Sequence, residues 1–259
     1  MPLELHSIEA GDMRPDSLPL VILHGLLGSA DNWRSALKRF GSERRIIALD
    51  LRNHGRSPHA QGMNYLSLAE DVLHTLDLKG VQRFQLLGHS MGGKVAMALA
   101  LHHPERVERL IVVDIAPLAY GHGHDNEFKA MQAVDDAQVE SRREADEVMS
   151  QWLPDKATRQ FIATNLQRDE SGRLTWRVGL AHLVDDYAHI GGNGALEGQY
   201  AGPVLLVKGN RSPYVTNEGI DASKALFPHL TVESLEAGHW VHAECFDAFK
   251  EVVDTFITA

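Results

Sequence analysis

Cysteine is nearly absent from this chain. Cys245 is the single cysteine among 259 residues, so no disulfide can form within the chain. No stretch of about 20 apolar residues is present to cross a bilayer. Residues 1–12 also lack the basic start and the apolar run of a secretory signal. We therefore expect a soluble, cytoplasmic protein without a membrane span.

Positive charge is also scarce. The chain has 25 Lys and Arg against 35 Asp and Glu, a formal net charge of -10. Non-specific nucleic-acid binding needs a basic surface, so we expect no nucleic-acid partner. The 15 histidines lack the spacing of metal ligands, and the pair His122 and His124 is interpreted as part of a flexible loop. We expect neither a metal nor a cofactor.

Short apolar runs alternate with stretches of helical spacing along most of the chain. The predicted strands are residues 19–24, 45–50, 84–88, 109–114, 204–208 and 231–235, and the predicted helices are 32–40, 67–78, 94–103 and 243–257. Buried strands that alternate with helices are typical of a mostly parallel sheet covered on both faces. The predicted fold class is therefore α/β.

This alternation stops between about residues 115 and 201. Apolar residues there share one helical face in residues 155–166 and again in residues 174–190. The segment is too long for one crossover connection. We interpret residues 116–201 as a small helical cap, inserted into a core of residues 1–115 and 202–259.

The pentapeptide Gly88-His89-Ser90-Met91-Gly92 has the pattern G-x-S-x-G and lies where a predicted strand meets a predicted helix. A serine on such a sharp turn is exposed as a nucleophile, and small neighbours let the strand and the helix approach closely. A serine hydroxyl also needs a base, an orienting acid and donors for the oxyanion.

The base and the oxyanion donors have candidates at loops that follow strands. His239 lies in a small-residue loop after the last strand, and His242 is the reserve base. A glycine-containing loop at residues 24–28 follows an early strand. The backbone amides of Leu26 and Met91 are the expected oxyanion donors, and Met91 also begins a helix.

Together these motifs resemble the α/β-hydrolase superfamily over nearly the whole chain. In that superfamily the acid usually follows the strand after the cap, but this sequence has Ser212 there. Asp114 ends the apolar run before the cap, where a lone buried carboxylate would be costly. We assign Asp114 as the orienting acid and Ser212 as an additional hydrogen-bonding partner. The alternative is that Asp114 only caps a loop. The orienting acid would then be one of three other carboxylates, namely Glu218, Asp221 or Asp247.

Three segments narrow the resemblance to the bacterial YbfF-type esterases: residues 50–57, residues 210–215 and residues 238–244. That family carries its acid after the strand that precedes the cap. The resemblance also implies a small helical cap and activity on short acyl esters, with acyl-CoA thioesters as further substrates.

We therefore predict a serine hydrolase of short acyl esters or thioesters, acting on a small-molecule substrate as a monomer or small homo-oligomer. The residues expected to contact substrate are His24, Gly25, Trp176, Tyr187 and Trp240. Lys94, Arg52 and Arg56 could supply the basic patch that a CoA leaving group would need. Two alternatives stay open. The first is a carbon–carbon bond hydrolase of vinylogous diketo acids, with Arg177 and Arg211 as sources of charge. The second is a ligand-binding protein on a hydrolase fold.

Overall fold

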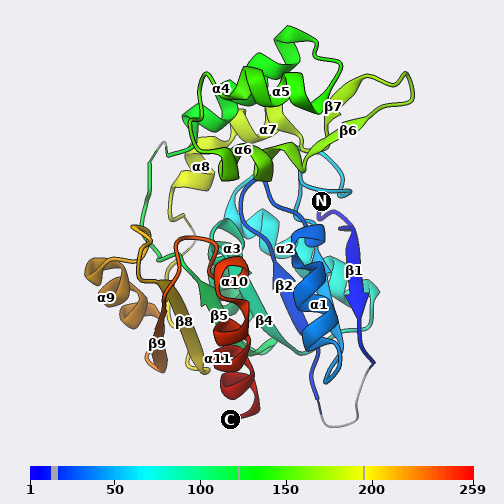
Figure 1. The fold of residues 1–259 in the computed structure, drawn as a ribbon. Coiled ribbons are helices and arrows are strands. Elements are labelled where there is room, and N and C mark those ends of the chain that lie inside the picture. The colour runs from blue at the N-terminus through cyan, green and yellow to red at the C-terminus, as the bar shows by residue number, and fades with distance from the viewer. Residues whose placement is uncertain (13–16, 122, 195) are drawn as a thin grey trace.

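The computed structural model describes residues 1–12, 17–121, 123–194 and 196–259. His122 and its predicted loop role lie outside these ranges. Figure 1 shows two layers, a lower core built on one sheet and an upper group of helices drawn in green and yellow. The two layers meet above the ends of the central strands.

The core sheet has seven strands in the order β1-β3-β2-β4-β5-β8-β9. These strands are β1 (Ser7–Ala10), β2 (Leu20–Leu23), β3 (Ile46–Leu49), β4 (Phe84–His89), β5 (Val107–Val113), β8 (Val204–Gly209) and β9 (Leu230–Leu235). Only β1 is antiparallel to its neighbour. The predicted α/β class and mostly parallel sheet are confirmed, whereas β1 was not predicted, because its four residues are only partly buried.

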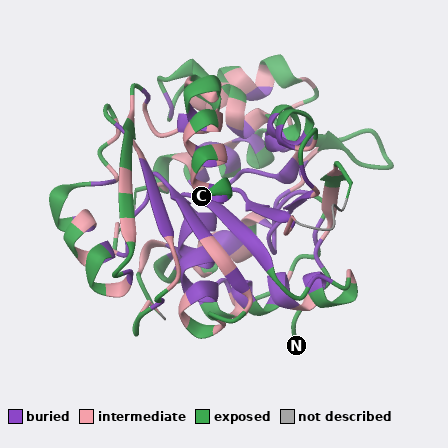
Figure 2. Ribbon diagram, turned by 90° about the horizontal axis from the view of Figure 1, so that it is seen from below, coloured by how far each residue is buried: buried purple, intermediate pink, exposed green. Residues whose placement is uncertain are grey.

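Alternate side chains of the central strands enter two separate cores. Leu20 and Ile22 pack with α1 (Arg34–Phe40) and α11 (Phe246–Thr258), while Val21 and Leu23 pack on the opposite face. That second face is covered by α2 (Tyr65–Leu78) and α3 (Met91–His102). Figure 2 shows the buried strands running between these helical layers. The remaining core helices are η1 (Ala30–Trp33), α9 (Asn217–Leu226) and α10 (Val241–Glu244).

The chain between β5 and β8 forms the upper layer in Figure 1. It consists of α4 (Asp125–Ala137), α5 (Arg142–Met149), α6 (Lys156–Ala163), β6 (Leu166–Arg168), β7 (Leu174–Trp176), α7 (Leu180–Asp185) and α8 (Tyr187–Gly191). We refer to these elements as the cap.

The prediction of one helix over residues 174–190 was wrong. Leu174–Trp176 pairs as β7 with β6 in an antiparallel hairpin, and the rest of the segment divides into α7 and α8. The hairpin turn is closed by the Asp169 carboxylate, which accepts hydrogen bonds from the backbone N–H groups of Ser171 and Arg173. Gly172 adopts φ 84° there. Turn chemistry therefore overrode the helical spacing of the apolar residues.

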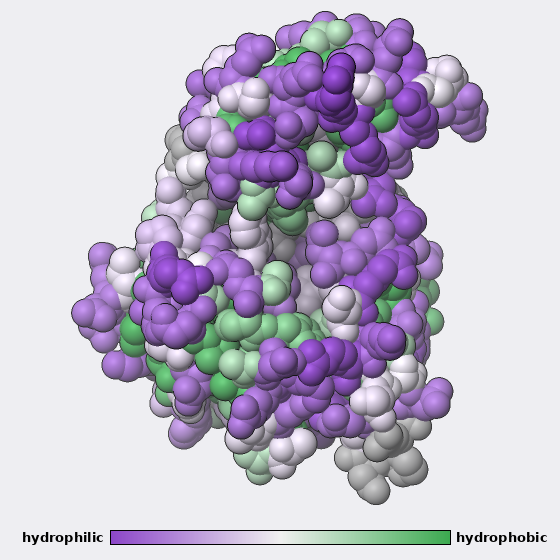
Figure 3. All heavy atoms as spheres, in the orientation of Figure 1, coloured by the Kyte–Doolittle hydropathy of each residue, from purple (hydrophilic) through white to green (hydrophobic). Residues whose placement is uncertain are grey.

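The carboxyl ends of the parallel strands point toward the cap. Figure 3 shows the molecule hollowed between the cap and the core at this level. In the described ranges, no helix is both long and apolar enough to cross a membrane. The hollow is where the residues of the candidate site meet.

Candidate active site

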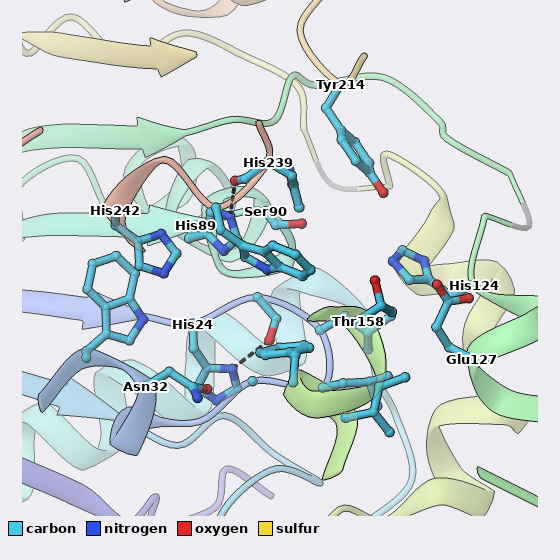
Figure 4. Close-up of a pocket in the computed structure, with 18 residues that line it drawn as sticks. His24, Asn32, His89, Ser90, His124, Glu127, Thr158, Tyr214, His239 and His242 are labelled. Carbon is cyan, nitrogen blue, oxygen red and sulfur yellow. Dashed lines mark hydrogen bonds between the residues drawn. The ribbon is translucent and has the colours of Figure 1, made fainter. Parts of the chain in front are cut away.

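Ser90 lies on a sharp turn between β4 and α3. Its backbone has φ 53° and ψ -120°, a conformation that residues other than glycine rarely adopt. The neighbouring glycines make this turn sterically feasible. A Cβ atom on Gly88 would lie 2.2 Å from the carbonyl oxygen of Gly92, and one on Gly92 would lie 2.5 Å from that of His24. The turn thus holds the Ser90 side chain at the cavity (Figure 4).

Asp114 follows β5 and is fully buried. One carboxylate oxygen accepts the backbone N–H of Gly209 at 2.9 Å. The other accepts the Ser212 hydroxyl and lies 2.7 Å from Nδ1 of His239. These donors offset the cost of burying the charge. The structure therefore brings together the predicted acid, the predicted base and Ser212.

The alternative residues have other partners or are exposed. His242 is stacked on Trp33 with ring centroids 4.2 Å apart, and burial lowers the pKa of His242 to about 3. Asp221 and Asp247 form ion pairs with lysine and arginine at the surface. Glu218 is exposed on α9. His242 lines the same cavity as His239, but no hydrogen bond between any of these groups and His239 or Asp114 is present in the described residues.

Leu26 and Met91 line the same cavity as Ser90. Leu26 belongs to the loop after β2, in which Leu27 has φ 58°, and Met91 is the first residue of α3. Within the described residues, neither backbone N–H donates a hydrogen bond, and the Ser90 hydroxyl also has no partner. The two amides are free for a ligand oxygen. Catalytic hydrogen bonds often close only when substrate binds.

Two cavities meet at Ser90. The first, of about 220 Å³, contains His239, Trp240 and the α6 residues Thr158, Phe161 and Ile162. The second, of about 270 Å³, contains Met91 together with apolar and aromatic side chains; these include Tyr65, Ile115, Tyr120, Tyr187 and Ile190. Leu26, Ser90, His124 and Tyr214 line both. We call them the histidine-side cavity and the amide-side cavity.

Four of the five residues expected to contact substrate line these cavities. His24, Gly25 and Trp240 line the histidine-side cavity, and Tyr187 lines the amide-side cavity. Trp176 does not line either cavity. It is buried within the cap, where its Nε1 donates to the carbonyl oxygen of Met131 at 3.1 Å. The predicted contact of Trp176 with substrate is therefore replaced by a packing role, because β7 places its ring inside the cap.

His24 supports the site through two hydrogen bonds. Its Nδ1 lies 2.8 Å from the carbonyl oxygen of Gly25, and its Nε2 accepts the backbone N–H of Leu51 at 2.9 Å. Burial lowers the pKa of His24 to about 4, so the ring is neutral. It therefore holds the loop of Leu26 in place more than it offers hydrogen bonds to a ligand.

Sequence reasoning missed three residues at the cavity. The Tyr214 ring stacks on His239 with centroids 4.2 Å apart. His124 and Glu127 of the cap face the same space (Figure 4). Burial raises the pKa of Glu127. Tyr214 lies two residues after Ser212, so its neighbourhood was visible in the sequence, but the cap residues carry no motif that marks them.

The three cations considered for a basic patch have different surroundings. Lys94 is buried in the amide-side cavity, where its ammonium group donates to the carbonyl oxygens of Leu118 and Gly192 at 2.5 Å each. Burial lowers the pKa of Lys94 to about 8. Arg52 is paired with the buried Asp71. Arg56 alone is at the surface, with 46% of its side chain exposed.

Comparisons with known proteins agree with this architecture. Residues 19–244 match the family model of the alpha/beta hydrolase fold, and the chain belongs to that family. It is 36% identical to esterase YbfF of Escherichia coli, covering 92% of each chain. It is 35% identical to the sn-1-specific diacylglycerol lipase ABHD11 of Danio rerio, covering 95% of this chain and 80% of that protein.

A solved structure extends the likeness to three dimensions. A marine microorganism esterase superposes with a TM-score of 0.93 at 33% identity, covering 98% of this chain and 99% of the other. The predicted resemblance to the α/β hydrolases and to YbfF is confirmed. These relatives support a hydrolase of the esterase or lipase type.

Proposed function

We propose that this protein is a serine hydrolase that cleaves esters and thioesters of short acyl groups through an acyl-enzyme. The observation that carries the proposal is the 2.7 Å contact between Asp114 and His239 beside the Ser90 turn, where two cavities meet. A nucleophile, a base and an orienting acid in this arrangement support acyl transfer.

In the proposed reaction, Oγ of Ser90 attacks the acyl carbonyl carbon while Nε2 of His239 accepts the serine proton. The carbonyl oxygen becomes an oxyanion, which the backbone amides of Leu26 and Met91 stabilise. Protonated His239 then gives its proton to the departing oxygen or sulfur. Asp114 stabilises the positively charged ring and fixes its tautomer. Water hydrolyses the acyl-enzyme by the same proton route.

The two cavities suggest where each half of the substrate lies. The leaving group must be close to the histidine that protonates it, which favours the histidine-side cavity. The acyl chain then occupies the amide-side cavity. At about 270 Å³ this cavity is smaller than the roughly 300–1,000 Å³ of most drug-sized ligand sites, and tyrosine rings form much of its lining. Both features favour short acyl chains.

The two alternative functions have less support. Arg177 and Arg211, considered as carboxylate-binding groups for a carbon–carbon hydrolase, do not line the two cavities. Arg211 is paired with Glu244. Lys94 does line the amide-side cavity, but two of its three N–H groups already donate to backbone carbonyl oxygens. A ligand-binding role would leave the Asp114–His239 contact without a function.

The test compares the wild type with Ser90→Ala on p-nitrophenyl esters of increasing acyl length and on matched acyl-CoA thioesters. We expect rapid cleavage of short esters that is lost in the variant, with an unchanged circular-dichroism spectrum. Cleavage retained in Ser90→Ala would overturn the assignment of the nucleophile. No cleavage by the wild type would favour the carbon–carbon hydrolase or the ligand-binding function.

A further inference from the structure

Three arginines surround one carboxylate where η1 meets the cap. Asp31 Oδ1 accepts hydrogen bonds from Nε and Nη2 of Arg34 at 3.0 and 2.7 Å. Asp31 Oδ2 lies 3.2 Å from Nη1 of Arg56 and 3.3 Å from Nη1 of Arg177. We call these four residues the arginine cluster. It joins two core segments to the cap, because Arg177 follows β7.

The arginine cluster has more positive than negative charge. Asp31 neutralises one of its three guanidinium groups. Asp50 lies beneath it, but that carboxylate is 1% exposed and accepts the backbone N–H groups of Ala30 and Arg56. The outer face therefore carries excess positive charge in a chain whose formal net charge is -10.

Arg177 has unused hydrogen-bonding capacity. Its Nε is buried without a partner in the described residues, and its Nη2 lies 3.5 Å from the carbonyl oxygen of Thr164. Arg52 shows what a fully used guanidinium looks like here. It donates to both oxygens of Asp71 and to the backbone carbonyl oxygen of Gln61. A guanidinium carries five N–H donors, so Arg177 can still donate to a ligand.

The arginine cluster does not itself line the histidine-side cavity, but two connections link it to residues that do. The backbone N–H of Arg177 donates to the carbonyl oxygen of Asn165 at 2.8 Å. The Asn165 side chain in turn donates to the carbonyl oxygen of Leu27 at 2.7 Å, and Leu27 lines the cavity. Asn32, the neighbour of Asp31, lines it as well. Asp31 is thus adjacent in sequence to one lining residue, and Arg177 is connected to another through Asn165.

We propose that the arginine cluster binds a phosphate group carried by the leaving group. This inference rests on the proposed hydrolase function and specifies its substrates. The planar guanidinium fork matches phosphate oxygens, and phosphate accepts several charge-assisted hydrogen bonds at once. Two leaving groups offer this chemistry next to an ester or thioester, namely CoA and glycerol phosphate. Asp31 orients the arginines but also repels the ligand.

A purely structural role, in which the arginine cluster only connects the cap to the core, predicts a different result for the Asp31→Asn variant. If the arginine cluster only joins the two layers, Asp31→Asn removes the shared partner and weakens the enzyme on every substrate. If it binds phosphate, Asp31→Asn removes the competing negative charge. The variant then favours phosphate-bearing substrates more strongly than the wild type does.

The experiment uses substrate pairs that differ in the phosphate-bearing part of the leaving group. Butyryl-CoA is compared with S-butyryl-pantetheine, and 1-butyrylglycerol 3-phosphate with 1-butyrylglycerol. We expect the wild type to prefer the phosphate-bearing member of at least one pair by about ten-fold in kcat/KM, mainly through KM. The pair that shows the preference identifies the source of the phosphate.

Charge variants then connect this preference to the arginine cluster. Arg56→Gln and Arg177→Gln should remove most of it, whereas Asp31→Asn should increase it. The matched control is Arg83→Gln, because Arg83 is also paired with one carboxylate, Glu108, but directly precedes β4, at the opposite end of that strand from Ser90. That control should leave both pairs unchanged. If Arg177→Gln lowers the melting temperature strongly, Arg56→Gln and Arg34→Gln decide, since both side chains are largely exposed.

A binding measurement separates this inference from the proposed function. Titration of the Ser90→Ala variant with CoA and with pantetheine does not depend on turnover. We expect CoA to bind about ten-fold more tightly than pantetheine if CoA is the source, and 300 mM KCl to reduce that difference. Equal kcat/KM within both pairs would overturn the phosphate site even if p-nitrophenyl butyrate is cleaved. Failure to cleave p-nitrophenyl butyrate would instead count against the hydrolase.

Discussion

Nε2 of His89 lies 2.9 Å from the backbone carbonyl oxygen of His239. The residue before the proposed nucleophile thus holds the loop that carries the proposed base. Burial keeps the pKa of His89 well below its ordinary value, so the ring is neutral and donates this hydrogen bond through Nε2. The rings of the two histidines also touch, with centroids 4.7 Å apart. His89 is a positioning residue for His239.

Replacing His89 tests this role. His89→Phe keeps a ring in the space but removes the donor, so we expect kcat to fall about ten- to a hundred-fold with little change in KM. His89→Gln retains an N–H donor and should recover part of the loss. Steady-state kinetics over pH 5–9 would show a changed kcat profile in the phenylalanine variant. Full kcat in His89→Phe would contradict the role.

Asp114 and Ser212 should differ strongly in importance. Asp114→Asn keeps the shape but removes the charge that stabilises protonated His239, so we expect kcat to fall by about a thousand-fold or more. Ser212→Ala removes one donor to the carboxylate and should cost about ten-fold. Both kcat values would be measured on p-nitrophenyl butyrate. The reverse ranking would assign the acid to another residue.

Much of the core was predictable because its signals are local. The runs that became β2 and β3 are continuous and apolar, and those of β4 and β8 are mostly so, as buried parallel strands are. The Ser90 turn was visible because a close approach of backbone atoms demands glycine at fixed positions. Asp114 was visible because a lone carboxylate at the end of a buried strand needs partners.

The cap was less predictable because its structure depends on contacts between distant segments. Trp176 occupies a β-hairpin that a polar turn closes, although its spacing suits a helix. Glu127 and Thr158 reach the cavity only because α4 and α6 fold over the core. The arginine cluster joins residues 31, 34, 56 and 177, and no short motif links them.

Two isoleucines test which cavity holds the acyl chain. Ile190 lines the amide-side cavity and Ile162 the histidine-side cavity, and both are buried residues of the cap. Ile190→Ala should shift the preferred p-nitrophenyl ester toward longer acyl chains. Ile162→Ala is the matched control and should leave the acyl preference unchanged while favouring bulkier alcohols. The exchange of these two results would reverse the assignment of the cavities.

Buried neutral histidines should make the fold sensitive to acid. Burial lowers the pKa of His24 to about 4 and those of His54 and His242 to about 3. Below the unfolded value near 6.5, the unfolded chain binds protons that the folded chain cannot. The stability that these groups contribute is therefore complete above about pH 6.5 and is lost as the pH falls toward the folded values. At pH 5.5 each group lowers the free energy of unfolding by about 1.4 kcal/mol.

Removing one of these histidines should weaken that dependence. His242→Phe keeps the stacking on Trp33 and eliminates a buried Nδ1 that has no partner among the described residues. Between pH 7.5 and pH 5.5, this variant should lose about 1.4 kcal/mol less unfolding free energy than the wild type. Urea unfolding at both pH values measures the difference, with His229→Gln as a control at an exposed position. An unchanged pH dependence in His242→Phe would mean that His242 is protonated in the folded protein.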